Sequence, residues 1–465
     1  MHVPDSNRNP PGASPAARRL ARKALAPIEH FLQIEASSGV VLLVMAVVAL
    51  VWANSPWRDA YDALWHTPVG LRLGPWAFER DLHFWINDGL MTVFFFVVGL
   101  EIRREIYQGE LSQARRAALP LVAALGGMLV PAALYLAFNA GHPSASGWGV
   151  PMATDIAFAI GVLALLGNRV SPAMRILLLA LAVIDDVGAI GVIAVFYSSG
   201  LAPVGFLVVA LGVAAIVTMQ KLGVRNVAAY IAPSVVIWAG FYASGIHPTL
   251  AGVMVGLMTP VRAWFGVEGF LDQATASVEE SRAKTNDGAQ ALLPHLDALN
   301  TARREAVSPL ERLLHLLHSW VAYGIMPLFA LANSGVEVGN ASFDGDGLRV
   351  FLGIVVGLAV GKPLGILGLS WALAQAGLVA LPTGVRWPHV GLVGMVAGIG
   401  FTMALFIAQL AFPAGPTLET AKLAILVGSA LAALLAFVGA RFVLKGPAPA
   451  VGAASDAEAE SSTEH

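Results

Sequence analysis

Four charged side chains lie inside long apolar segments of this sequence: Asp155, the adjacent pair Asp185 and Asp186, and Lys362. A charge at the centre of a bilayer costs roughly 2.5–3.5 kcal/mol on insertion scales, so each one requires a partner or a function. Lys362 can pair with one carboxylate and simply hold two helices together. Three carboxylates against one lysine leave a surplus, which is typical of a cation site that is also a proton site.

The two adjacent aspartates are expected to have different roles. Neighbouring positions on a helix point about 100° apart, so both side chains face one ligand only if the helix is distorted. One of them can face Lys362, which leaves the other for a separate role.

Two of the apolar segments are interrupted. Residues 147–156 contain Pro151 and the polar pair Thr154 and Asp155, and proline removes one backbone donor from a helix. Residues 394–402 contain three glycines and a threonine, which also weaken a continuous helix. Interrupted spans in corresponding places of two halves indicate a transporter site near the bilayer midplane. Four glycines spaced four apart, within residues 353–365, are instead expected to form a helix-packing ridge.

The segments that carry these residues are expected to span a membrane. Apolar residues make up 57% of the 465 residues and charged residues only 12%, which excludes a soluble globular protein. A net charge of −2 gives no basic excess for nucleic acid, and the lack of cysteine excludes disulfides and cysteine metal sites. The pattern predicts an all-α polytopic membrane protein with about 12 transmembrane helices. The expected spans are 37–54, 84–101, 117–138, 149–167, 173–198, 203–220, 225–243, 246–261, 310–333, 348–375, 388–412 and 419–444.

The distribution of Lys and Arg predicts the orientation. With the N-terminus on the inner side, 22 of these residues fall on inner segments and five on outer segments, which agrees with the positive-inside rule. Twelve spans then place both termini in the cytoplasm. The chain divides into a cytoplasmic arm (1–35), a transmembrane domain (36–445) with a polar cytoplasmic insert (262–309), and a cytoplasmic tail (446–465) expected to be disordered. A cleaved signal peptide fits less well, because the leader is too long and its cleavage site would contain Trp52.

Residues 69–79, between the first two spans, alternate around Gly74 and Pro75 and predict a small periplasmic β-hairpin. A two-stranded hairpin is only marginally stable alone, and its outer position offers no large domain to dock on. It is therefore expected to pair with a second copy in a homodimer. On the inner side, Ser308, Pro309 and Glu311 suit the N-cap, N1 and N3 positions and predict a helix start there.

Six short motifs, in order along the chain, resemble those of the NhaA family of bacterial sodium/proton antiporters. They are WIND at 85–88, VGLEIRRE at 98–105, TDIAFAIG at 154–161, AVIDDVGA at 182–189, GKPLG at 361–365 and GIGFT at 398–402. The resemblance extends from about residue 30 to 445 and implies an inverted-repeat, multi-pass transporter of the bacterial inner membrane. Its substrates would be Na⁺, with Li⁺ as an alternative, and H⁺, and no cofactor would be required. The rule on interrupted spans is itself drawn partly from this family, so the two arguments are not independent.

The resemblance implies a role for each intramembrane charge. Asp186 and Asp155 would be the main carboxylates for the transported Na⁺ and for protons, with Thr154 part of the same site. Asp185 and Lys362 would form an adjoining charge pair. The interrupted spans, the fourth and the eleventh, would cross at their middles so that half-helix ends face each other, and Asp155 and Lys362 would offset their partial charges.

General chemistry agrees with these roles. Na⁺ is a hard cation that prefers oxygen ligands, which carboxylates and unwound carbonyls supply. Burial raises the pKa of a carboxylate from about 3.9 toward the working range. Protons and Na⁺ then compete for the same oxygens. If the site changes sides only when one of them occupies it, exchange follows without further machinery.

Further titratable residues flank the spans. In the family, the inner end of the second span belongs to the cation-access and pH-sensing region, although a plain interfacial ion-pair cluster explains these residues equally well. Many family members carry Glu immediately before the position of His315, where this chain has Leu314. The candidates for cation access or pH sensing are Asp88, Glu101, Arg104, Glu105, His247, Glu311, His315 and His318.

Two other classes of protein are less compatible with the sequence. An intramembrane aspartyl protease also has two membrane aspartates, but its GxGD motif is missing before Asp155 and Asp185. A sodium-coupled solute symporter could use similar interrupted helices, but it would need an organic-substrate pocket that no motif indicates. Release of protons on addition of Na⁺ would separate antiport from symport.

Overall fold

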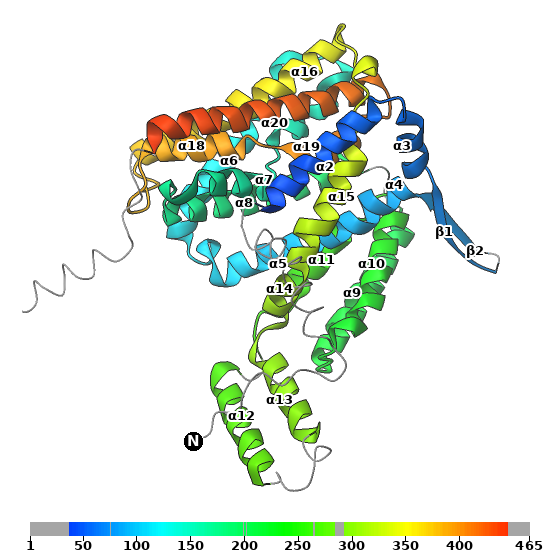
Figure 1. Ribbon diagram of the computed structural model, residues 1–465, viewed down its shortest axis with the longest axis vertical. Helices are drawn as coiled ribbons and strands as arrows, with labels where there is room; N and C mark the ends of the chain where they lie inside the picture. The colour runs from blue at the N-terminus through cyan, green and yellow to red at the C-terminus, as the bar shows by residue number, and fades with distance from the viewer. Residues whose placement is uncertain are drawn as a thin grey trace, which may run out of the picture.

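The computed structural model describes residues 37–74, 76–198, 200, 202–263, 266–283 and 293–444 (Figure 1). Within these ranges the chain is mostly helical, and its one sheet is a two-stranded hairpin. The expected cytoplasmic arm (1–35) and tail (446–465) lie outside the described residues. The architecture agrees with an all-α membrane protein that carries one small hairpin.

Eight helical segments of the described chain are long and apolar enough to cross a membrane, and three bent pairs raise the number to as many as 11. The protein is therefore a multi-pass membrane protein. The eight segments are α4–η1–α5 (Leu82–Gln108), α6 (Ala114–Asn139), α8 (Pro172–Phe196), α9 (Pro203–Lys221), η5–α10 (Val227–Ser244), α14–η8–α15 (Pro309–Asn333), α16–η10–α17 (Asp346–Gln375) and α20 (Pro416–Val443).

The predicted span 246–261 differs from the structure, where helix α11 covers only Leu250–Met258. Gly245 adopts a left-handed conformation with φ of 82° and ends the preceding helix. Thr259 is extended because it precedes Pro260, which disfavours a helical conformation at that position. At a rise of about 1.5 Å per residue, nine residues are too few to cross the hydrocarbon core alone.

Three pairs of helices meet at sharp bends. Helix α2 (Ser37–Ala53) is followed at 117° by the short α3 (Arg58–Trp65), which the sequence analysis did not predict. The 3₁₀ helix η3 (Pro143–Met152) and α7 (Ile156–Leu165) form a bend of 46°. Helices α18 (Trp387–Ala397) and α19 (Phe401–Ala411) form a bend of 53°. The last two breaks fall where the sequence predicts interrupted spans.

The glycine ridge of the tenth expected span packs as predicted. Gly365 of α17 (Lys362–Gln375) lies so close to Gly126 of α6 that a Cβ on Gly365 would meet the Gly126 carbonyl. Gly353 lies against the side chains of Tyr135 and Asn139 of the same helix, α6. Because small residues let two backbones approach closely, the ridge fixes this long helix against α6.

Strands β1 (Pro68–Leu73) and β2 (Trp76–Asp81) form the antiparallel hairpin, which projects from the helices in Figure 1. Its turn contains Gly74 at φ of 60°, whereas Pro75 lies outside the described residues. The hairpin docks on one helix of the chain rather than on a large domain, since Phe78 packs on the rings of Trp238 and Tyr242 of α10 (Ile231–Ser244).

The polar insert forms a pair of helices, α12 (Gly266–Ala283) and α13 (Leu293–Ala306), at the lower end of Figure 1, away from the hairpin. Glu305 of α13 forms an ion pair with Arg225, which follows α9. Helix α14 (Pro309–Trp320) begins where predicted, and the Ser308 hydroxyl caps it by accepting a bond from the backbone N–H of Glu311 at 3.2 Å.

Candidate functional site

The break between η3 and α7 contacts the break between α18 and α19 directly. The backbone N–H of Asp155 donates to the carbonyl of Ile399 at 2.8 Å. The Thr154 hydroxyl lies 3.0 Å from the carbonyl of Ala397. The crossing is deeply buried, since Asp155 is 0% and Thr154 1% exposed. Backbone groups that have no helical hydrogen-bond partner at the breaks therefore bond to the other segment across the crossing.

The carboxylate of Asp155 joins the two half-helices that begin at the crossing. One oxygen accepts the backbone N–H of Phe158 at 3.0 Å and caps α7. The other accepts the backbone N–H of Thr402 at 3.1 Å and also the Thr402 hydroxyl, at the start of α19. Because a helix N-terminus carries a partial positive charge, two helix ends stabilise this one negative charge.

Lys362 occupies the other side of the crossing. Its ammonium donates to Asp185 Oδ2 at 2.8 Å and to the carbonyl of Met152, the last residue of η3. Asp185 Oδ2 also lies 2.7 Å from the Thr154 hydroxyl. Lys362 is 0% and Asp185 2% exposed. The lysine therefore offsets both a carboxylate and the carbonyl end of a helix.

Asp186 differs from both of these carboxylates. It is only 2% exposed, yet no hydrogen bond or ion pair reaches its carboxyl group from the residues that the structure describes. The charged groups near enough to interact with it include Asp185, Glu101, Asp155 and Lys362. This agrees with the expectation that only one of the adjacent aspartates faces Lys362. Asp186 has oxygens that are available to a ligand.

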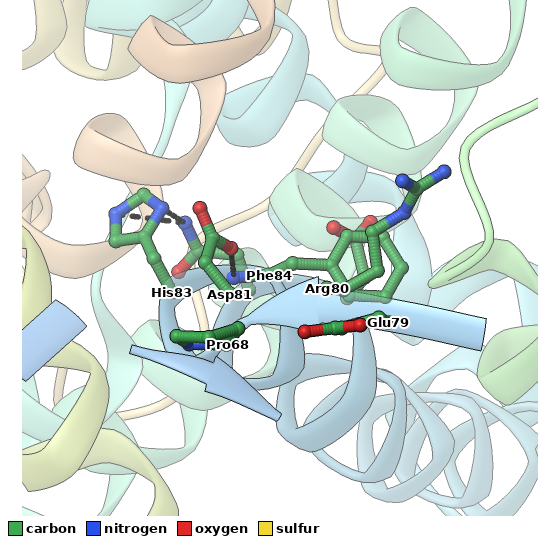
Figure 2. A pocket seen from close by; sticks show the side chains of 8 residues that line it. Pro68, Glu79, Arg80, Asp81, His83 and Phe84 are labelled. Atoms are coloured by element: carbon green, nitrogen blue, oxygen red, sulfur yellow. Dashed lines mark hydrogen bonds between the residues drawn. The ribbon is translucent and has the colours of Figure 1, made fainter. Parts of the chain in front are cut away.

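Asp88 and His247 lie apart from this cluster, on the hairpin side. The His247 ring and the Asp88 carboxylate approach to 3.4 Å, and the ring also contacts the Thr249 hydroxyl at 2.8 Å. Next to them is a cavity of about 520 Å³ at the foot of the hairpin (Figure 2). The charged and polar residues that line it are Glu79, Arg80, Asp81, His83, Asn87 and Asp88.

The other candidates for cation access or pH sensing occupy two neighbouring helices, α5 (Met91–Gln108) and α14. Glu105 has a local role, since its carboxylate accepts the backbone N–H of Glu110 at 2.9 Å. Glu101 and Arg104 lie on the same helix, partly buried, and Glu311 lies in the first turn of α14. His315 and His318 are exposed on α14, and their side chains make no hydrogen bond or ion pair within the described ranges.

The sequence analysis did not assign several groups that hold the crossing together. Thr402 was noted only as an interruption, although it contacts Asp155 twice. Ser429 of α20 accepts the backbone N–H of Phe401 at 3.1 Å and was not noted at all. Thr402 could have been identified from the sequence as a hydroxyl residue that directly follows a glycine-rich break in an apolar segment. The carbonyls of Met152, Ala397 and Ile399 have no side-chain signal in the sequence.

Comparison with known proteins identifies close relatives along nearly the whole chain. The sequence model of a family described as Na⁺/H⁺ antiporter 1 matches residues 29–439. A protein of Sorangium cellulosum (strain So ce56) named Na(+)/H(+) antiporter NhaA 2 is 57% identical, with 100% of each chain covered. A protein of the same name from Myxococcus xanthus (strain DK1622) is 54% identical over 99% of this chain and 98% of the relative. The Na(+)/H(+) antiporter NhaA of Janthinobacterium sp. (strain Marseille) is 48% identical over 96% and 99%.

Proposed function

The chain belongs to the Na⁺/H⁺ antiporter 1 family, and from this premise we propose that Asp186 is the carboxylate at which Na⁺ and H⁺ replace each other. Members of this family are transporters rather than enzymes, and their substrates are Na⁺ and H⁺. The sodium-coupled symporter considered from the sequence is not supported.

The observation that carries this proposal is the unequal hydrogen bonding of the three buried aspartates. Asp155 accepts bonds from two helix N-termini, and Asp185 accepts bonds from Lys362 and Thr154. A carboxylate engaged in this way has fewer lone pairs left for an ion. Asp186 has no such bonds among the described residues, so both of its oxygens are available to an ion.

The charges around the site support the same assignment. The two helix ends at Asp155 supply about half an elementary charge each, which balances its carboxylate. Lys362 balances Asp185. The third carboxylate, Asp186, has no compensating group of its own, and an uncompensated buried charge is unfavourable. It is therefore compensated by one bound proton or one bound Na⁺, and the two exclude each other.

Na⁺ in this site is a transported substrate, and its ligands would be oxygens near the crossing. Asp186 and Asp155 would supply carboxylate oxygens, with the Thr154 hydroxyl and unwound backbone carbonyls close by. Asp185 and Lys362 would balance charge beside the ion. The short breaks in both spans let carbonyls leave the helical hydrogen-bond pattern, which is how secondary transporters expose oxygens in a membrane.

The wider architecture forms part of the proposal. Twelve spans with inverted repeats would place the crossing at the midplane, with both termini in the cytoplasm of a bacterium and the hairpin in the periplasm. Glu101, Arg104 and Glu105 on α5, with Glu311, His315 and His318 on α14, would lie at the cytoplasmic access to the site. Asp88 and His247 would lie on the periplasmic side. The insert 262–309 would then be cytoplasmic.

We also propose that the hairpin of residues 69–79 pairs with a second copy of the chain. The hairpin extends beyond the helices (Figure 1), and within the described residues its two strands form a sheet with no third strand. Two strands leave free edges on both sides. Phe78 and Arg80 hold the base of the hairpin on α10, which orients those edges for a partner.

The experiment is Asp186→Asn, with Na⁺-driven proton movement measured in proteoliposomes. The amide keeps the size of the side chain but cannot exchange a proton, so we expect no exchange and an unchanged melting temperature. The matched control is Asp344→Asn, an exposed aspartate in a loop, which should transport at the wild-type rate. Wild-type exchange by a folded Asp186→Asn protein would overturn the assignment.

A further inference from the structure

Helix α12 of the insert exposes an amphipathic face that the described residues leave uncovered. Leu271 and Val278 are 56% and 42% exposed and lie seven residues apart, on one side of the helix. Three exposed carboxylates, at spacings of four and seven residues, form a second stripe beside them and make no hydrogen bond or ion pair with the described residues. They are Glu268, Asp272 and Glu279. We call the two stripes together the acidic face of α12.

The other side of α12 is held by the rest of the insert. Glu280 approaches the ring of His295 on α13 to 3.3 Å, and Ser277, on the same side of α12, is buried. At the base of the insert, the backbone N–H of Leu310 donates to the carbonyl of Pro260 at 3.3 Å. The two helices therefore form one unit with a closed base, and the acidic face points away from it.

The charge of the acidic face restricts what can cover it. A second copy of α12 carries the same negative charge, and so do the anionic lipids of an inner leaflet. The tail, residues 446–465, is acidic as well. The N-terminal arm has the complementary composition, because residues 18–25 read RRLARKAL and contain four basic residues and two leucines.

The arm is long enough to reach the insert. Ser37, the first described residue, lies beside the helical segment that follows the insert, with its hydroxyl 2.6 Å from that of Tyr323 in η8 (Val321–Ile325). Tyr323 is about 21 Å along that segment from its start at Pro309. The chain from Leu25 to Ser37 extends over as much as about 40 Å. The basic segment can therefore lie against α12.

We propose that residues 18–25 of the N-terminal arm dock on the acidic face of α12. The arginines and the lysine pair with the three carboxylates, and Leu20 and Leu25 cover Leu271 and Val278. Exposed ion pairs are individually weak, but a tethered segment is present at an effective concentration in the millimolar range, so a weak affinity suffices. The contact does not depend on the aspartate site.

Cross-linking of the full chain in detergent tests the docking, because the chain contains no cysteine and introduced thiols are unique. Ala21→Cys in the arm is combined with Thr275→Cys, which lies between the two stripes, and treated with a short bifunctional methanethiosulfonate. The matched control combines Ala21→Cys with Gln273→Cys, also exposed but on the other side of α12. We expect links within one chain to form about tenfold faster at position 275. Equal rates at the two positions would overturn the docking.

Removal of charge tests what holds the arm. Glu268→Gln, Asp272→Asn and Glu279→Gln together should lower the linking rate at position 275 about tenfold, since three weak ion pairs are lost. Molar salt should lower the rate in the same way with all three carboxylates intact, which covers the case that the triple variant folds poorly. A rate that responds to neither change would overturn the ionic contact.

Two further measurements identify the occupant. Protein with Ala21→Cys alone is mixed with protein that carries Thr275→Cys alone, and we expect no link between the two chains. Such a link would assign the face to the arm of a second copy. Linking is also repeated in liposomes with and without phosphatidylglycerol, and we expect the same rate in both. Loss of linking in the anionic liposomes would show that the arm binds lipid instead, and either result would overturn the docking within one chain.

Discussion

Replacing Lys362 tests the charge pair at the crossing. Its ammonium contacts Asp185 at 2.8 Å and the carbonyl of Met152, and it is 0% exposed. Lys362→Met keeps most of the side-chain volume and removes the charge. Lys362→Ala removes the charge and also empties space beside Gly127, where an added Cβ would lie 3.7 Å from the lysine Cε.

The size of the effect follows from what each variant leaves behind. Removal of one partner of a buried ion pair costs about 3–5 kcal/mol, because the other charge stays buried and unpaired. We expect Lys362→Met to lose an amount in this range, and Lys362→Ala to lose more by a cavity contribution. The double variant Lys362→Met with Asp185→Asn has no unpaired charge, so it should regain part of the loss. The expected coupling is about 0.5–3 kcal/mol.

The assay is reversible unfolding by SDS titration in mixed micelles. It is applied to the wild type, Lys362→Met, Asp185→Asn and the double variant. Transport is measured in parallel and should be impaired in all three variants. Strictly additive losses in the cycle would refute the pairing of Lys362 with Asp185. A Lys362→Met protein as stable as the wild type would refute the claim that the lysine balances a buried charge.

Three further predictions concern Thr402, Gly365 and the hairpin. Thr402→Val should cost about 1.5–3 kcal/mol in the same titration, because it removes a hydrogen bond to a charged Asp155, and Thr402→Ser should restore most of it. Gly365→Val should prevent folding, measured as loss of monodisperse protein after extraction, whereas Gly368→Val on the same helix should be tolerated because its Cβ would meet open space. Deletion of residues 71–77, which spares Phe78, should convert dimers to monomers in mild detergent while transport persists. Dimers that survive the deletion would refute the hairpin contact.

The sequence predicts the helix breaks well because local chemistry determines them. Proline, glycine and polar residues inside an apolar run weaken the helix at their own positions, so the breaks at 153–155 and 398–400 could be located within a few residues. Even so, Pro151 lies inside η3 rather than at the break. The length of an apolar run is less informative, since 246–261 is as apolar as a span but contains only a nine-residue helix.

The functional residues are only partly predictable for a different reason. Charged side chains are costly in membrane-spanning segments and therefore rare there, so the three aspartates and Lys362 could be identified from the sequence. Which aspartate pairs with the lysine depends on helix rotation, so only the family resemblance indicated Asp185. Thr402, which binds Asp155, lies 247 residues away from it in the sequence. Backbone carbonyls and the side-chain amides of Asn87, Asn333 and Gln409 join segments more than 70 residues apart, and no local pattern indicates them.

Proton release on Na⁺ binding tests the central claim, that Na⁺ and H⁺ compete for Asp186, most directly. Purified protein in weakly buffered detergent is titrated with Na⁺ over a range of pH values while released protons are recorded. We predict release by the wild type, with an apparent dissociation constant for Na⁺ that falls about tenfold per pH unit as the pH rises while Asp186 is protonated. Asp186→Asn should give no release. Release of the same size from a folded Asp186→Asn protein, or a Na⁺ affinity that does not change with pH, would contradict the account.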